Sequence, residues 1–368
     1  MDVAPKGYPT PTPAHWAALA GMRFFLSLIV YIGHLGGTIG KTRFTNAWED
    51  LGELAAVLAF FIISGFSIAN SIEQRPRGYI VRRVWRIWPT YLFSFFCCTL
   101  PAVVLLPRFT NQYPADQTVT WEMVIGNLLM LQGLIVPVLE ANAATWTLAI
   151  EEWCYLAAPV FRRLRSSLLL VLIVISAVCY ANARSWGWVR FAGQTHGVSH
   201  LCFVWAWLIG FFFYRHRQSA WAHALLLLLP LWLITGANEL GGSRAAFTIL
   251  AGTLAVAYGG ALLRLPETLV EVEGREGKTY RLRASHIEKF LVFLGNVSYP
   301  LYIVHYPVFF LMHHLTGNQN HAAYLTSVFM LCVVVYELVD KPNRNRWQKR
   351  VPEPARKEEQ KPMGINRS

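Results

Sequence analysis

Charged residues are scarce in this 368-residue sequence, at 15% against about 25% in an ordinary soluble domain. Hydrophobic residues make up 54% of the chain. A soluble protein of this composition would lack the polar side chains needed to cover its surface, so an ordinary soluble fold is excluded. A lipid bilayer offers an apolar solvent instead, and each crossing helix needs about 20 apolar residues. The 14 Trp and 15 Tyr agree with this interpretation, because both rings favour membrane–water interfaces.

Several functional signals are also missing. The six cysteines form no CxxC pair and no metal-ligand spacing, so we expect buried thiols and predict no metal site. Residues 1–15 lack a cationic region with a cleavage site, and no cleaved signal peptide is expected. No internal repeat indicates an inverted-repeat transporter.

Eleven apolar runs follow one another along the chain: 16–36, 51–72, 88–106, 121–138, 148–161, 166–182, 199–213, 219–236, 244–263, 289–313 and 322–339. The run 121–138 contains Glu122, Asn127, Gln132 and Pro137, so it is interpreted as a re-entrant or interfacial segment. Ten crossings then remain. The sequence predicts an all-α, polytopic transmembrane helical bundle with about ten crossings and cytoplasmic N- and C-termini.

The distribution of Lys and Arg supports this topology. Segments assigned to the cytoplasm hold 26 of these residues and segments assigned to the outside hold 6, as the positive-inside rule requires. The net charge of +12 is therefore explained by membrane orientation, and no nucleic-acid partner is predicted.

Three regions are expected along the chain: a cytoplasmic N-tail (1–15), a single transmembrane domain (16–340), and a basic, disordered cytoplasmic tail (341–368). The longest cytoplasmic loop, 264–288, alternates apolar and polar residues at Val270–Gly274 and Lys278–Leu282. That alternation predicts a small β-hairpin.

Ionisable groups inside membrane helices are costly and mark candidate functional sites. Arg23 and His34 share the first helix, where eleven residues place them on one face and about 16 Å apart. Arg83 and Arg86 lie one helical turn apart, beside Arg82, and such a group can bind phosphates. Each has a structural alternative: snorkelling for Arg23, packing for His34, and membrane anchoring for the arginine group.

Two further segments carry polar groups at membrane depth. Glu151 and Glu152 are adjacent near the outer start of a helix, and Glu151 shares a face with Tyr155. His305 lies about 24 Å along a helix that begins near Lys289. A structural hydrogen bond is the alternative role for each. The depths place His34, Glu151 and His305 in the outer half and the arginines near the cytoplasm. A histidine with a carboxylate in hydrogen-bond range could act as a general base.

These residues resemble the motifs of the membrane acyltransferase-3 family, in the family's order and across residues 15–345. The matching segments are Arg23 with His34 (Arg-x10-His), Phe60–Phe66 (FFxxSGF), Arg83–Tyr91 (RxxRIxPxY), Trp146–Tyr155 (WSLxxExxFY), Leu294–Pro307 (LGxxSYxLYxxHxP) and Asp340–Pro342 (EKP). Thr147, Ala149 and Cys154 depart from the pattern.

The resemblance implies a bacterial inner-membrane O-acyltransferase that moves an acyl group, usually acetyl, from cytoplasmic acetyl-CoA to a polysaccharide hydroxyl. The acceptor would be an extracytoplasmic or lipid-linked glycan of the exopolysaccharide type, and polysaccharide-synthesis machinery would be a partner. The resemblance implies that the catalytic residues are His34, Arg23, which supports His34 or contacts the donor, and Glu151, which lines the transfer site. It implies that Arg83, Arg86 and Arg82 bind the donor, and that His305, Tyr302 and Tyr155 line the substrate site.

Two other interpretations of the same charges stay open. A transporter or flippase of a lipid-linked glycan would use intramembrane charges for passage of its substrate. A non-enzymatic subunit of a polysaccharide export complex would use them to hold helices together. For an enzyme, the sequence also leaves open whether His34 acts as a general base or carries the acyl group itself.

Overall fold

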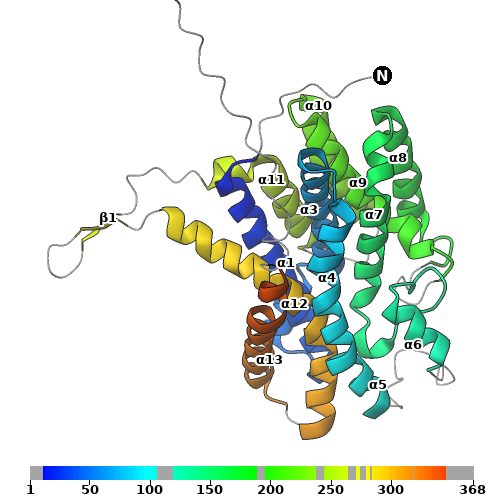
Figure 1. Ribbon diagram of the computed structural model, residues 1–368, viewed down its shortest axis with the longest axis vertical. Coiled ribbons are helices and arrows are strands. Elements are labelled where there is room, and N and C mark those ends of the chain that lie inside the picture. The colour runs from blue at the N-terminus through cyan, green and yellow to red at the C-terminus, as the bar shows by residue number, and fades with distance from the viewer. Residues whose placement is uncertain are drawn as a thin grey trace, which may run out of the picture.

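Helices dominate the chain in a computed structural model that describes residues 11–105, 119–188, 195–237, 244–263, 271–273, 279–281, 284–317 and 319–344. They pack side by side into one bundle (Figure 1). The first half contains α1 (Pro13–Ile39), α2 (Arg43–Glu49), α3 (Glu53–Gln74), α4 (Tyr79–Ser94), η1 (Phe95–Thr99), α5 (Leu100–Leu105), α6 (Trp121–Leu128), η2 (Glu140–Asn142) and α7 (Thr145–Arg163). The second half contains α8 (Ser166–Asn182), α9 (Val198–His216), α10 (Ala220–Trp232), η4 (Leu233–Ala237), α11 (Ala245–Leu262), β1 (Glu271–Glu273), β2 (Thr279–Arg281), α12 (Ala284–Thr316), α13 (His321–Val335) and η6 (Tyr336–Asp340).

Among the described residues, seven helices are long and apolar enough to cross a membrane: Pro13–Ile39, Glu53–Gln74, Tyr79–Leu105, Val198–His216, Ala245–Leu262, His286–Thr316 and His321–Arg344. The predicted all-helical membrane bundle is confirmed at this level. The three other predicted crossings correspond to α7, α8 and the α10–η4 helix. Of these, α8 and α10–η4 are apolar but shorter, and α7 carries Glu151, Glu152, Arg162 and Arg163. The count of ten crossings and the cytoplasmic termini stay predictions.

The run 121–138 does not cross as a helix. Its helix α6 has eight residues, which span about 12 Å, and it is followed by turns and an isolated bridge between Gln132 and Val136. Asn127 stabilises this segment, because its side-chain amide donates to the Met123 and Pro137 carbonyl oxygens and its Oδ1 accepts from the Leu139 amide.

Small residues let the central helices approach closely. A Cβ on Gly65 of α3 would lie 1.9 Å from the Trp207 carbonyl oxygen of α9, and a Cβ on Gly210 would lie 2.0 Å from the Ile62 carbonyl oxygen. Each glycine therefore faces the partner helix's backbone, a packing mode that membrane helices favour because lipid supplies no hydrophobic drive between them. Gly65 belongs to the Phe60–Phe66 motif, so this part of the motif serves packing.

Helix α1 packs along α12. It begins with Thr12 as N-cap, whose hydroxyl accepts from the His15 amide, and with Pro13 at its first position. A Cβ on Gly295 of α12 would lie 2.5 Å from the Ala20 Cβ of α1, so the two helices touch there. This pairing brings the polar face of α1 to the polar face of α12.

Two predictions outside the main bundle have different outcomes. The predicted hairpin is present, since β1 and β2 pair antiparallel with Val272 opposite Tyr280 (Figure 1). The tail prediction is corrected at its start, because residues 341–344 continue the last helix and Arg344 packs against α12. The rest of the tail and residues 1–10 lie outside the described residues.

Candidate active site

A cavity of about 760 Å³ lies among α1, α3, α4, α7 and α12. Six arginines line it against one acidic residue, Glu151: Arg23, Arg75, Arg82, Arg83, Arg86 and Arg344. Arg75 is exposed and the other five are partly buried, and so many cations around one cavity repel one another unless anions neutralise them. The cavity is therefore suited to a ligand that carries several negative charges.

One face of α3 holds the arginines of the cavity through its serines. Ser64, Ser67 and Ser71 follow a spacing of three and four residues, which places them on the same side of the helix. Ser67 accepts a 2.5 Å hydrogen bond from Arg23, and Ser71 accepts one of 2.7 Å from Arg83. Ser64 is 2.9 Å from the Tyr155 hydroxyl. The helix thus orients charged side chains without neutralising them.

The three predicted donor-binding arginines of α4 have different contacts. Arg82 donates to the backbone carbonyl oxygens of Arg75 and Arg77, so its guanidinium stabilises the turn before α4. Arg83 bonds Ser71 through one nitrogen, while its buried Nε has no partner among the described residues. Arg86 makes no hydrogen bond or ion pair with any residue that the structure describes. Arg83 and Arg86 are therefore the α4 cations left available to an anion.

Tyr155 and Glu151 of α7 also line the cavity. The Tyr155 hydroxyl, shared with Ser64, contacts the Glu151 carboxylate, and Arg23 lies within electrostatic range of both. Glu152 points elsewhere and accepts a 3.0 Å hydrogen bond from the Trp88 ring nitrogen. Of the two adjacent acids, Glu151 is the one at the cavity.

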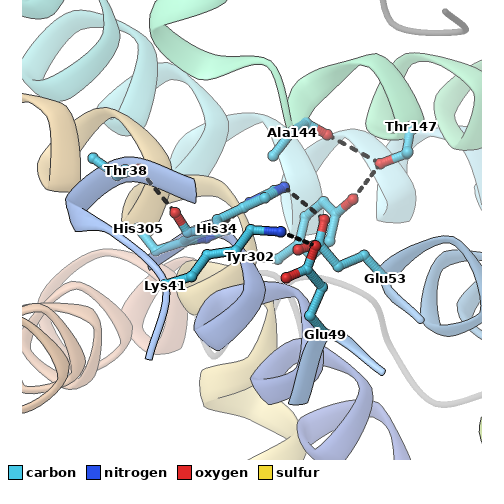
Figure 2. A network of polar contacts seen from close by, with 9 residues as sticks. All are labelled: His34, Thr38, Lys41, Glu49, Glu53, Ala144, Thr147, Tyr302 and His305. Carbon is cyan, nitrogen blue, oxygen red and sulfur yellow. Dashed lines mark hydrogen bonds and ion pairs between the residues drawn. The ribbon is translucent and has the colours of Figure 1, made fainter. Parts of the chain in front are cut away.

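Tyr302 closes the cavity on the side of His305. Its hydroxyl lies 2.6 Å from the Thr147 Oγ1, which also donates to the Ala144 carbonyl oxygen (Figure 2). The Phe60 ring packs edge-on against the Tyr302 ring at 5.8 Å. These three side chains line the cavity, while the His305 ring lies behind Tyr302 at 6.3 Å. We call this contact of Tyr302 with Thr147 and Phe60 the partition, because Tyr302 lines the cavity and also packs against the His305 ring.

His34 and His305 form a stacked pair behind the partition (Figure 2). The His34 Nδ1 lies 2.9 Å from the His305 Nε2, and the ring planes differ by 16°. His305 is fully buried, and its Nδ1 lies 2.7 Å from the Leu301 carbonyl oxygen. The His34 Nε2 lies 3.5 Å from the Glu53 Oε2, so the order of groups is Glu53, His34, His305 and the Leu301 carbonyl.

The contacts assign the protons along this chain. The Leu301 carbonyl oxygen can only accept, so the His305 Nδ1 carries a proton. A neutral His305 then accepts at its Nε2, and the hydrogen on that bond belongs to the His34 Nδ1. The lone pair of a neutral His34 consequently sits on Nε2, the nitrogen beside Glu53. This geometry presents a base, held in one tautomer by His305, next to a carboxylate that can stabilise its protonated form.

His34 and His305, both predicted from the sequence, lie together, but the carboxylate beside them is Glu53. The sequence placed Glu151 with His34 and His305 in the outer half, whereas in the structure Glu151 contacts Tyr155 in the arginine cavity and Glu53 is the acid at His34. Glu53 is the first residue of an apolar helix that runs for 22 residues. An acid at that position in a membrane segment was the available signal, and the depth argument used for His34 also applies to it.

The His34–Glu53 contact and the arginine cavity lie at opposite ends of α3. Glu53 begins the helix beside His34, while Arg75 follows its last residue and lines the cavity. A helix of 22 residues is about 33 Å long, close to the roughly 30 Å thickness of a bilayer core. The side chains of His34 and Glu53 are 21% and 34% exposed, and the neighbouring Lys41–Glu49 ion pair of 2.7 Å lies at the surface.

Metal ligation is not suggested by the described part of the chain, where no three His, Cys, Asp or Glu side chains converge. The six cysteines are free thiols, and all except Cys97 are at least partly buried.

The fold and this site define a multi-pass membrane protein with a cationic cavity and a histidine–carboxylate group on a polar pathway. A family model described as an acyltransferase domain, that of the acyltransferase-3 family, matches residues 16–338. The chain belongs to this family, and the protein is an acyltransferase.

Two curated relatives bear names that agree with the family. Putative acetyltransferase ORF330 of Acidianus two-tailed virus is 22% identical over 319 residues, which cover 81% of this chain and 84% of the viral protein. Acyltransferase MdmB of Streptomyces mycarofaciens is 26% identical over 163 residues, covering 42% of this chain and 41% of that protein. No solved structure matches the chain.

Proposed function

We propose that this enzyme transfers an acetyl group from cytoplasmic acetyl-CoA to a hydroxyl of an extracytoplasmic or lipid-linked polysaccharide of the exopolysaccharide type, in a bacterial inner membrane. One observation carries the proposal: a cavity rich in unneutralised arginines and an oriented histidine base lie on opposite sides of the Tyr302–Thr147 contact.

The cavity residues fit the donor. Coenzyme A carries phosphates at its nucleotide end and a thioester at the end of a long flexible arm. Arg83 and Arg86 retain donor groups for phosphate oxygens, and a cavity of about 760 Å³ lies in the size range of ligand sites. The arm would extend past Arg23 toward Tyr302, and the thioester would meet the histidine pair once the partition opens.

His34 would act as the general base in the transfer. Its Nε2 takes the proton from the acceptor hydroxyl while that oxygen forms a bond to the acetyl carbonyl carbon. The carbon–sulfur bond then breaks, and the same proton returns to the sulfur, so that the products are an O-acetyl ester and the CoA thiol. Glu53 stabilises the imidazolium ion, and His305 keeps the ring in the required tautomer.

The acceptor would approach from the Glu53 side. His34 and Glu53 are partly exposed there, and the surface groups nearby, Lys41 and Glu49, are hydrophilic. A sugar hydroxyl is an acceptor that such a polar entrance can admit. Separate polysaccharide-synthesis proteins would supply the glycan, with membrane lipid as the carrier of a lipid-linked acceptor.

The test uses the full-length protein in membrane vesicles with acetyl-labelled acetyl-CoA and a bacterial exopolysaccharide extract. The expected result is ester-linked label in the glycan, removed by mild base. A flippase would move intact glycan without needing acetyl-CoA, and a structural subunit would do neither. Glycan movement without acetyl label would therefore replace this proposal with the transport function.

A further inference from the structure

The Asp340–Pro342 motif has no role in the chemistry above. It lies two residues before Arg344, whose side chain lines the cavity. Arg344 ends the last described helix and lines the cavity together with Arg86. Its Nη1 donates to the Asn296 Oδ1 at 2.7 Å and to the Asp340 Oδ2 at 3.3 Å. Among the described residues, no side chain or carbonyl bonds its other guanidinium nitrogens.

Asp340 connects Arg344 to α4, the helix that carries the predicted phosphate-binding residues. Its Oδ1 accepts a 3.4 Å hydrogen bond from Thr90, which is fully buried on α4. Thr90 is four residues after Arg86, hence on the same face of α4. The carboxylate therefore holds Arg344 beside Arg86, and the order of the motif, an acid four residues before the arginine, produces this geometry.

The positive charges of Arg86 and Arg344 are not balanced by the acidic residues described around them. Arg86 lies within electrostatic range of Arg344, Arg83 and Arg23, while Asp340 is the acid that acts on it. Asp340 is already engaged by Arg344 and Thr90. Two guanidinium groups that share one occupied carboxylate at the wall of a cavity favour a further anion between them. Phosphate oxygens match paired guanidinium donors in bidentate geometry.

We propose that Arg344, positioned by Asn296 and Asp340, binds a phosphate group of the donor together with Arg86. This inference rests on the proposed function in naming coenzyme A as the carrier of that phosphate. The last helix thereby completes the donor site from the opposite end of the chain, and Asp340, the first residue of the Asp-Lys-Pro segment, supports a ligand-binding arginine.

The test compares Arg344→Gln with Lys341→Gln in purified full-length protein in nanodiscs, using calorimetry with CoA, dephospho-CoA, inorganic pyrophosphate and pantetheine. Lys341 is the matched control, because it lies one turn earlier, is exposed, and pairs with Glu337. We expect Arg344→Gln to weaken CoA binding by about tenfold or more. Pantetheine binding should be unchanged, and Lys341→Gln should remain within twofold of the unsubstituted protein for every ligand.

Each result has a defined meaning. A larger loss for CoA than for dephospho-CoA assigns Arg344 to the 3′-phosphate, and equal losses assign it to the pyrophosphate; both support the proposal. CoA binding within twofold of the unsubstituted protein, or an equal loss for pantetheine, overturns it. Should Arg344→Gln fail to fold, Asn296→Ala, which releases the arginine but keeps its charge, must weaken CoA binding several-fold and leave pantetheine unaffected.

Failure of the proposed function can be distinguished from failure of the phosphate site. If the unsubstituted protein binds no CoA, coenzyme A is not the donor. In that case, pyrophosphate binding that depends on Arg344 would still support the phosphate site, and a lack of pyrophosphate binding would overturn it.

Discussion

The arginine cavity and the histidine pair are built from the same few helices but differ in how their charged groups are arranged. In the cavity, serine hydroxyls of α3 orient guanidinium groups that stay electrically unbalanced, so the region is prepared to receive charge from outside. Around His34, each nitrogen already faces a group of this chain, and the region is prepared to move one proton. The arginine cavity is therefore suited to binding the donor, and the groups around His34 are suited to the chemical step. Variants should therefore affect the two functions separately.

The largest expected effect is that of His34→Ala. Removing the base should lower acetyl transfer by about a thousandfold, within the range of general-base catalysis. CoA affinity should change by less than twofold, because His34 does not line the cavity. Transfer rates and calorimetry on the same preparation measure both quantities. Sustained transfer would remove His34 from the mechanism, and a matching loss of CoA affinity would break the division between the two regions.

Glu53→Gln should have the next largest effect. The amide keeps the shape but cannot stabilise an imidazolium ion, so the maximal rate should fall by about ten- to a hundredfold with little change in the donor's KM. The matched control is Glu49→Gln, an acid nearby that pairs with Lys41 at the surface. Equal rates for Glu53→Gln and Glu49→Gln would show that the Glu53–His34 contact has no part in the reaction.

Arg86→Gln should affect donor binding in the arginine cavity. Loss of a charge-assisted contact to phosphate should raise the donor's KM by about tenfold while the rate at saturation stays within threefold. Arg163→Gln serves as the control, since Arg163 lies in a separate groove between α4 and α7. A loss confined to the saturated rate would assign Arg86 to the chemical step instead.

The smallest effect is expected at the partition. Tyr302→Phe removes the hydroxyl bonded to Thr147 but keeps the ring packed against Phe60. Loss of one buried hydrogen bond should ease opening and raise acetyl-CoA hydrolysis without acceptor by about two- to tenfold. Thr147→Val, which breaks the same bond from the other helix, should give a similar increase. Unchanged hydrolysis in both variants would mean that the contact does not control passage.

The parts of this molecule that depend on local spacing were predictable from the sequence. The 3.6-residue period placed Arg23 and His34 on one face of α1, and both lie on the polar pathway. The hairpin at β1 and β2 followed from alternation within one loop. The short helix α6 agreed with the polar residues of its segment, because a run that buries Asn127 and Gln132 needs hydrogen bonds that lipid cannot offer.

The parts that depend on contacts between distant residues were not predictable. Glu53 reaches His34 because α2 returns the chain to the end of α1, and nothing in the local pattern distinguishes this acid from Glu151. Arg344 was assigned to a disordered tail, because the contact with Asn296 that orders it spans 48 residues. The partition also required the structure, since Thr147 and Tyr302 are 155 residues apart.

The most direct test of the account is whether the two regions open to opposite faces of the membrane. In a cysteine-free variant that retains activity, Arg75→Cys would mark the cavity and Glu49→Cys the histidine side, 26 positions apart across α3. An impermeant maleimide added to oriented vesicles should label one of them from outside and the other only after the vesicles are opened. Labelling of both from the same face would contradict transfer through the bundle.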